Sequence, residues 1–141
     1  MPFLFFGQTP NAVKWEAKYN ELANGEGEIV ITGTVEKGWH TYSMFISDSI
    51  APIATLITFS PGSNYETVGK PTEEGAKVEF DKMFDAKIGS FNHKAVFKQK
   101  VKRKNLKEFQ TPLRVEFIAC NDNQCLPPKT IDFMLVVPPK K

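Results

Sequence analysis

The sequence lacks several features that would point directly to a function. No apolar stretch approaches the roughly 20 residues that a helix needs to span a membrane. The formal net charge of +2 is too small to indicate binding to nucleic acid or to an anionic membrane surface. Only residues 82–88 come near a helical apolar period, and they do so weakly. What remains is a chain of 141 residues, the size of one domain, in which helices are not the main elements.

Cysteine and histidine are also scarce, which limits metal chemistry. The chain has two cysteines, Cys120 and Cys125, and two histidines, His40 and His93. Zinc usually takes four ligands, and the chain offers one close cysteine pair without a second paired motif. Nothing marks either histidine as the partner of a nucleophilic cysteine. A metal site is thus the least favoured reading of the cysteine pair, and we expect no cofactor.

What the sequence does contain is alternation of apolar and polar residues with period two, the signature of β-strands. Turn-forming residues such as Asn24-Gly25 and Pro61-Gly62 separate these stretches. Many short strands with frequent turns predict an all-β, antiparallel sandwich or barrel, and two sheets packed face to face suit the pattern. The alternating segments are residues 13–19, 29–35, 53–59, 113–119 and 131–137.

The two ends bound the expected domain. Residues 2–8 form a short apolar burst that looks like the end of a signal peptide, or else a hydrophobic terminus that packs on the domain. We expect 1–11 to be such a remnant or disordered, 12–138 to be one β-sandwich domain, and 139–141 to be a tail or the start of a linker. Export would place the cysteines in an oxidising compartment, where a disulfide is the default expectation.

Four lysines recur at every second position near the middle of the chain: Lys98, Lys100, Lys102 and Lys104. On a strand they share one face. They form either a docking patch for an acidic partner or, as we favour, a solvated strand face that also discourages pairing at a sheet edge.

The richest segment is the one that holds both cysteines. Four polar residues separate Cys120 from Cys125, between the expected strands 113–119 and 131–137. Loops of four residues commonly join antiparallel strands, so the cysteines become near-opposite residues, close enough for a disulfide. Such a bond closes a small loop and stabilises by only about 2 kcal/mol, against about 4.7 for a 100-residue loop. The arithmetic favours a redox role over a structural staple.

Two neighbouring features bear on reactivity. Pro127 and Pro128 have no backbone N–H to give to a central sheet, so Cys125 is expected near an open edge where another thiol can reach it. Asp122 lies between the cysteines in sequence, and its charge is expected to raise a thiol pKa and to slow unwanted reactions of the reduced pair.

The cysteine segment through Pro128 resembles the active-site hairpin of the N-terminal periplasmic domain of the DsbD thiol:disulfide interchange protein family. The stretch 38–42, Gly-Trp-His-Thr-Tyr, looks like that family's glycine–aromatic strand, and the likeness runs from about residue 13 to 138. The spacing between the cysteines is shorter here than in the best-known members, and the familiar aromatic cap tripeptide is not reproduced.

The resemblance implies an immunoglobulin-like β-sandwich in the periplasm that passes electrons to thioredoxin-like proteins. It also implies recharging by a thioredoxin-like domain fed from a membrane-embedded partner, in the same parent protein or another. In this reading Cys125 attacks and Cys120 resolves. The implied cap over the cysteines is Phe84 or Met83, with a core position for Phe84 as the equal alternative.

The resemblance places Tyr42 and His40 in the lining of the site.

The rival function is a structural or adhesion sandwich with a permanent hairpin disulfide, or a ligand-binding sandwich that uses exposed Trp15 and Trp39.

Overall fold

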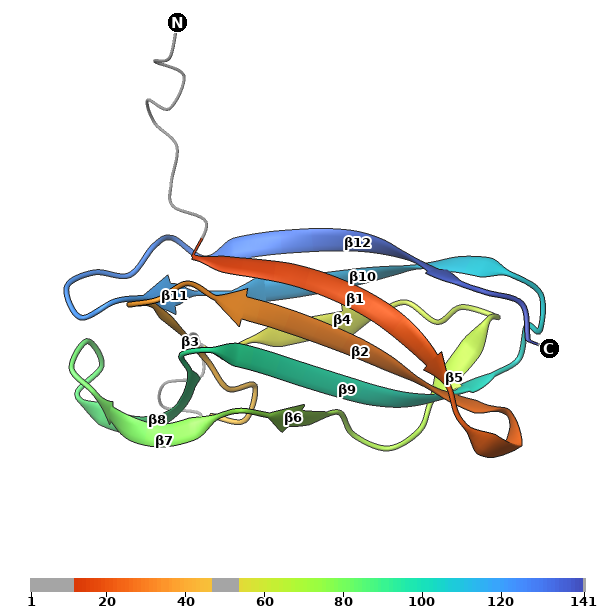
Figure 1. Ribbon diagram of the computed structural model, residues 1–141, viewed down its shortest axis with the longest axis horizontal. Coiled ribbons are helices and arrows are strands. Elements are labelled where there is room, and N and C mark those ends of the chain that lie inside the picture. The colour runs from red at the N-terminus through yellow and green to blue at the C-terminus, as the bar shows by residue number, and fades with distance from the viewer. Residues whose placement is uncertain (1–11, 47–53, 141) are drawn as a thin grey trace, which may run out of the picture.

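The computed structural model describes residues 12–46 and 54–140, which form twelve β-strands and one short 3-10 turn, Ala23–Gly25. The expectations for residues 1–11, for Ile53 and for residue 141 lie outside the described residues. The strands build two face-to-face layers and a smaller sheet at one end of the elongated molecule (Figure 1). This is the expected immunoglobulin-like antiparallel β-sandwich, and Cys120 belongs to the small sheet at its end.

The first layer is a five-stranded sheet in the order β1-β2-β9-β5, with β6 also pairing with β9. All of its strand pairs are antiparallel. A two-residue turn signal, Asn24-Gly25, joins its first two strands, and both residues have positive φ. The strands are β1 (Val13–Glu21), β2 (Glu26–Val35), β5 (Tyr65–Thr67), β6 (Thr72–Glu74) and β9 (Lys94–Arg103).

The second layer is a three-stranded sheet in the order β12-β10-β4, also antiparallel. Alternate side chains of both layers point inward and form the main core, where Ile31, Phe97 and Val115 are at most 1% exposed. Trp15 and Trp39 pack against this core, so the expectation that they are exposed aromatics is wrong. The strands are β4 (Leu56–Phe59), β10 (Phe109–Phe117) and β12 (Lys129–Val137).

The strand that carries most of the lysines, β9, does not lie at a sheet edge, contrary to the expectation. β9 lies inside its sheet, between β2 on one side and β5 and β6 on the other. Edge protection therefore cannot explain its lysines. Instead, Glu26 and Glu66 both stand opposite Lys102 in the register, and Lys98 forms an ion pair with Glu74 at 2.8 Å. Acidic neighbours on the flanking strands balance the lysines, which fits the solvated strand face.

The third sheet has the order β11-β3-β8-β7. Residues 82–88, the weak helical candidate, instead form the turn between β7 and β8 and the beginning of β8. Gly75 lies in the turn between β6 and β7 and has φ +104. An added Cβ there would lie 2.4 Å from the Lys94 carbonyl oxygen, so this turn requires glycine. The strands are β3 (His40–Tyr42), β7 (Lys77–Asp81), β8 (Ala86–Phe91) and β11 (Ala119–Cys120).

The register of the third sheet separates two environments. Residues that face each other across strands share a side of the sheet. Thr41 pairs with both Ala119 and Phe91, all three are buried, and Ala119 and Phe91 belong to the main core. Cys120 pairs with His40 and so lies on the opposite face. The third sheet thus has the main core on one side and the cysteine region on the other.

Candidate redox site

The cysteines form a disulfide, with an S–S distance of 2.01 Å, at the mouth of a small loop. They face each other in an isolated antiparallel bridge, as the sequence predicts. The loop is closed by the Asn121 N–H, which donates to the Gln124 carbonyl at 2.8 Å. The side-chain oxygen of Asn121 accepts from the N–H groups of Asn123 and Gln124, both at 2.8 Å. These local hydrogen bonds hold the two sulfur-bearing residues side by side.

The strands that flank the disulfide differ from the expectation. β10 ends at Phe117, and its partner β12 begins at Lys129, so residues 118–128 leave the second layer. Cys120 is then added to the third sheet through its pairing with His40. The Thr41 hydroxyl donates to the Ile118 carbonyl at 2.8 Å, and this hydrogen bond holds the segment after β10 against β3. The disulfide is therefore anchored by β3 rather than by the β10–β12 hairpin.

The two sulfur-bearing residues differ in burial. Cys120 is 0% exposed, whereas Cys125 is half-buried. Cys120 forms a small apolar cluster with Tyr42 and Ile88, against which Phe84 and Ile46 pack among others. Pro127 and Pro128 after Cys125 are exposed and lie outside the strands. Of the two cysteines, Cys125 is therefore the more accessible to an incoming group.

The two candidate cap residues occupy different positions. Phe84, in the β7–β8 turn, packs against the cluster and meets the Tyr42 ring edge-on, with 5.8 Å between ring centroids. Met83 is 43% exposed. Phe84 is thus a packed aromatic next to the Cys120 cluster, and its role as a cap stays a prediction.

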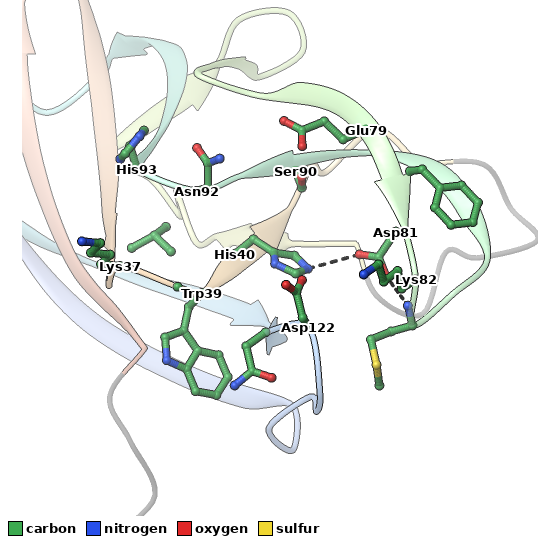
Figure 2. Close-up of a pocket in the computed structure, with 15 residues that line it drawn as sticks. Lys37, Trp39, His40, Glu79, Asp81, Lys82, Ser90, Asn92, His93 and Asp122 are labelled. Atoms are coloured by element: carbon green, nitrogen blue, oxygen red, sulfur yellow. Dashed lines mark hydrogen bonds and ion pairs between the residues drawn. The ribbon is translucent and has the colours of Figure 1, made fainter.

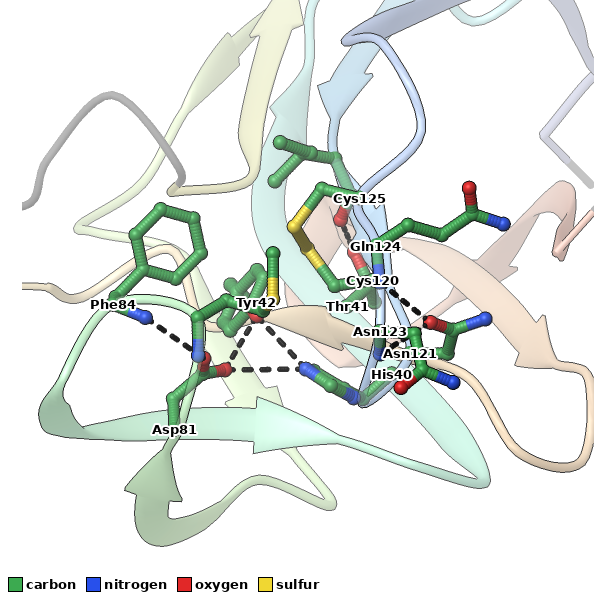
Figure 3. The surroundings of a disulfide bond; sticks show 12 residues. His40, Thr41, Tyr42, Asp81, Phe84, Cys120, Asn121, Asn123, Gln124 and Cys125 are labelled. Carbon is green, nitrogen blue, oxygen red and sulfur yellow. Dashed lines mark hydrogen bonds and ion pairs between the residues drawn. A yellow bond between two sulfur atoms is a disulfide. The ribbon is translucent and has the colours of Figure 1, made fainter.

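A hydrogen-bond network centred on Asp81 ties the β7–β8 turn to the site floor (Figure 3). Its carboxylate accepts from the Tyr42 hydroxyl at 2.5 Å and lies 3.2 Å from His40 Nε2. The other oxygen accepts from the N–H groups of Met83, at 2.9 Å, and Phe84, at 3.2 Å. Asp81 therefore fixes both the aromatic floor and the segment that carries Phe84.

The same network perturbs the tyrosine. Tyr42 is 0% exposed, and its burial is the main cause that raises the pKa of its hydroxyl. The hydrogen bond to Asp81 and the negative charge of Asp81 raise this pKa further. His40 Nε2 also lies 2.8 Å from the Tyr42 oxygen. Tyr42 thus remains a neutral hydrogen-bond donor beneath the disulfide across the physiological pH range.

An open cavity of about 580 Å³ borders the site, between the β7–β8 turn and the cysteine loop (Figure 2). His40 and Asp81 lie in its wall, and Asp122 extends from the cysteine loop toward His40. His93 lies on the far side of the cavity, beside Asn92. The structure thus brings His40, Tyr42 and Phe84 together with the cysteines, while Asp122 is exposed on the loop and His93 is remote.

Sequence reasoning missed Asp81 as the centre of this network. Asp81 lies two positions before Met83, one of the two predicted cap residues, but its partner Tyr42 is 39 positions away in the chain. Within residues 12–46 and 54–140, no group of three or more His, Cys, Asp or Glu side chains is arranged to hold a metal ion. The described part of the chain also contains no helix long and apolar enough to cross a membrane.

Comparisons with solved structures return domains of the same fold. The chain is similar to the reduced DsbD N-terminal domain of Neisseria meningitidis (14% identity, TM-score 0.57, 87% of this chain and 83% of that one). It is also similar to the N-terminal periplasmic domain of ScsB from Proteus mirabilis (13%, 0.60, 91% and 47%). A third similar structure is the complex between the DsbD and PilB N-terminal domains of N. meningitidis (12%, 0.56, 91% and 87%).

No curated protein sequence matches the chain significantly. The family described as "Thiol:disulfide interchange protein DsbD, N-terminal" matches residues 9–136, which include both cysteines and all the described strands apart from the last residue of β12. The sandwich and the disulfide at the mouth of a four-residue loop agree with that match. The chain is therefore a thiol–disulfide interchange module that belongs to the family of DsbD N-terminal domains.

Proposed function

We propose that this chain passes electrons to exported thiol proteins through reversible opening of the Cys120–Cys125 disulfide, with Cys125 as the sulfur that exchanges with partners. The observation that carries the proposal is the difference in burial: Cys125 is half-buried and Cys120 is 0% exposed. Thiol–disulfide exchange requires the incoming thiolate to reach one sulfur along the S–S axis. Burial of the other sulfur then directs attack to Cys125.

The transfer takes two exchange steps. In the reduced chain, the Cys125 thiolate attacks one sulfur of a partner's disulfide, which forms a mixed disulfide and releases one partner thiolate. The Cys120 thiolate then attacks Cys125, closes the intramolecular disulfide and releases the second partner thiolate. Both partner thiolates take up protons from solvent, so the partner gains two electrons and two protons. The oxidised chain is reduced again by the reverse steps with a dithiol donor.

Phe84 and Met83 are the proposed cap, and Tyr42, His40 and Asp122 the proposed surroundings of the reacting sulfurs. Phe84 packs against the Cys120 cluster, and we expect a partner to displace it on binding. The Asp81 hydrogen bonds hold the segment that carries Phe84 in the closed position. Met83, which is 43% exposed, is placed to meet the partner first.

The proposed partners are thioredoxin-like domains, as electron donor and as acceptors, in the periplasm. Two similar structures support this: one is a periplasmic domain, and the other is a complex between a DsbD N-terminal domain and the PilB N-terminal domain. A membrane-embedded domain, in the same parent protein or another, is the proposed source of electrons for the donor.

The test is a redox titration. The protein is equilibrated in glutathione buffers, and the free thiols of Cys120 and Cys125 are quantified by alkylation and mass spectrometry. We expect a potential of about −180 to −230 mV, in the range of glutaredoxin and isomerase couples. A pair that stays oxidised below about −300 mV is a structural disulfide and overturns the proposal.

The assignment of roles has its own test. Cys120→Ala is expected to trap a mixed disulfide between Cys125 and an oxidised thioredoxin-like protein, because the resolving thiol is missing. Cys125→Ala is the matched control and is expected to trap none. Recovery of the trapped complex only with Cys125→Ala would reverse the two roles.

A further inference from the structure

Two side chains from outside the strands, Phe84 and Ile46, cover the cluster around Cys120 and are called the shield here; the β7–β8 turn supplies only one of them. Phe84 comes from that turn, whereas Ile46 comes from the segment that follows β3. Both pack against the buried cluster of Tyr42, Ile88 and Cys120. Neither residue belongs to a strand, so each needs other contacts to stay in place.

Glu73 supplies such contacts to the segment that carries Ile46. One carboxylate oxygen accepts from the Ser43 hydroxyl at 2.5 Å, and the other accepts from the Met44 N–H at 3.0 Å. The Ser43 oxygen in turn accepts from the Phe45 N–H at 2.9 Å. The three residues immediately before Ile46 are thus bonded to one carboxylate, directly or through one hydroxyl.

The arrangement parallels the way Asp81 holds the other side. Asp81 binds the N–H groups of Met83 and Phe84, and Glu73 binds the N–H group two residues before Ile46. Hydrogen bonds to a charged carboxylate are about twice as strong as those between neutral groups. Each side of the shield is therefore fastened by one acidic residue.

The anchor of Glu73 lies outside the third sheet. Glu73 belongs to β6, which pairs with β9 in the first layer, and stands opposite Phe97 of the main core. Thr55 adds a second fastening, because its hydroxyl donates to the Tyr42 carbonyl at 2.6 Å. The segment after β3 is thus held to the first layer by Glu73, in addition to the Ser43 N–H that donates to the Gly89 carbonyl of β8 at 3.0 Å.

We propose that Glu73 is a positioning residue that holds Ile46 over the Cys120–Cys125 disulfide and thereby limits its reduction by small thiols. This inference rests on the proposed function, because a shield against small thiols matters only for a pair that exchanges with protein partners. Glu73 touches neither sulfur nor partner and acts through Ser43, Met44 and Ile46.

The reaction that the shield slows is simple exchange with a small dithiol. A dithiothreitol thiolate attacks Cys125, the S–S bond breaks, and the Cys120 thiolate leaves. The second thiol of dithiothreitol then closes its six-membered disulfide and releases Cys125 as a thiol. Attack requires the shield to open, so the rate follows the population of the open form.

The test measures the second-order rate constant of reduction by dithiothreitol in Glu73→Gln, in Ile46→Ala and in the double variant. Glu73→Gln keeps the shape but removes the charge and one acceptor. We expect each single variant to react about tenfold faster, which corresponds to about 1.4 kcal/mol of shield opening. Because both act on one element, we expect the double variant to react no faster than the faster single variant.

Three further variants exclude other causes. Glu74→Gln, at the next position and paired with Lys98, is expected to react at the wild-type rate. Ser43→Ala removes the hydroxyl donor without changing any charge and is expected to accelerate reduction, as Glu73→Gln does. Val115→Ala makes a cavity in the main core and lowers global stability away from the shield; we expect no acceleration.

The proposal is overturned if Glu73→Gln reacts at the wild-type rate, or if its acceleration is fully retained in the Ile46→Ala background. It is also overturned if Val115→Ala accelerates reduction as much as Glu73→Gln, because opening would then be global unfolding. These rates require no partner protein. A failure of the proposed function would instead appear in the redox potential and in the trapping of partners.

Discussion

Replacement of Asp81 by alanine tests whether one carboxylate organises the redox site. Asp81 is 8% exposed and accepts hydrogen bonds from the Tyr42 hydroxyl and from two N–H groups of the β7–β8 turn. Alanine has no side-chain oxygen, so all of these hydrogen bonds are lost. The Tyr42 hydroxyl then loses its charged partner inside a buried cluster, and the segment that carries Phe84 loses its fastening.

The expected cost follows from these contacts. A buried donor left without its partner costs about 1–3 kcal/mol, and each half-exposed backbone bond contributes about 0.5–1.5 kcal/mol. Removal of the buried charge recovers part of this, since its desolvation cost disappears. We expect Asp81→Ala to lower the free energy of unfolding by about 3 kcal/mol, with the denaturant dependence unchanged. Urea unfolding monitored by tryptophan fluorescence measures both quantities.

A second readout distinguishes loss of this network from general damage. The pKa of Tyr42 is raised by burial first, and then by the hydrogen bond and the charge of Asp81. Without Asp81, tyrosinate absorbance should appear at a lower pH in the folded protein. Glu79→Ala, an exposed carboxylate on the same strand, is the matched control and should change neither quantity. Unfolding of Asp81→Ala within about 0.5 kcal/mol of wild type would refute this account of the site.

Two further predictions concern the disulfide and the tyrosines. The double variant Cys120→Ser/Cys125→Ser should fold and lose about 2 kcal/mol in urea unfolding, because a loop closed across five positions restricts the unfolded chain only slightly; a loss above about 4 kcal/mol would support the structural reading. Burial raises the pKa of both Tyr42 and Tyr65, so above about pH 10 only the unfolded chain gives up these protons. The free energy of unfolding should therefore be constant below that pH and should fall above it by about 1.4 kcal/mol per pH unit for each of the two tyrosines. Tyr42→Phe should remove the contribution of one tyrosine. Equal slopes of the free energy of unfolding against pH in the wild type and the variant would contradict the assignment.

The long strands were predictable because each buries one face over many residues. Expected segments such as 29–35 and 131–137 lie inside β2 and β12, where inward side chains alternate with outward ones. The cysteine pair was equally accessible to sequence reasoning, since its bridge depends on a loop of four residues. In both cases the determining contacts are local or strictly periodic.

The strand pairing of the third sheet escaped prediction for the opposite reason. β3 has three residues and β11 has two, too short for any period to show. Their pairing joins His40 to Cys120 across 80 positions of the chain, and no local pattern encodes such a register. The same holds for the two acidic residues that fasten the shield, since Asp81 and Glu73 bind groups 39 and 30 positions away.

The placement of the disulfide on the outer face of this small sheet has a thermodynamic consequence. The main core, with Phe91 and Ala119, occupies the other face. Opening of the proposed shield would expose the small cluster around Cys120, which is separate from the main core. The free energy of opening is then set by a few hydrogen bonds and two side chains, Phe84 and Ile46, well below the global stability of a domain. A partner that binds the open form can therefore supply this energy without unfolding the protein, which a disulfide buried in the main core would not allow.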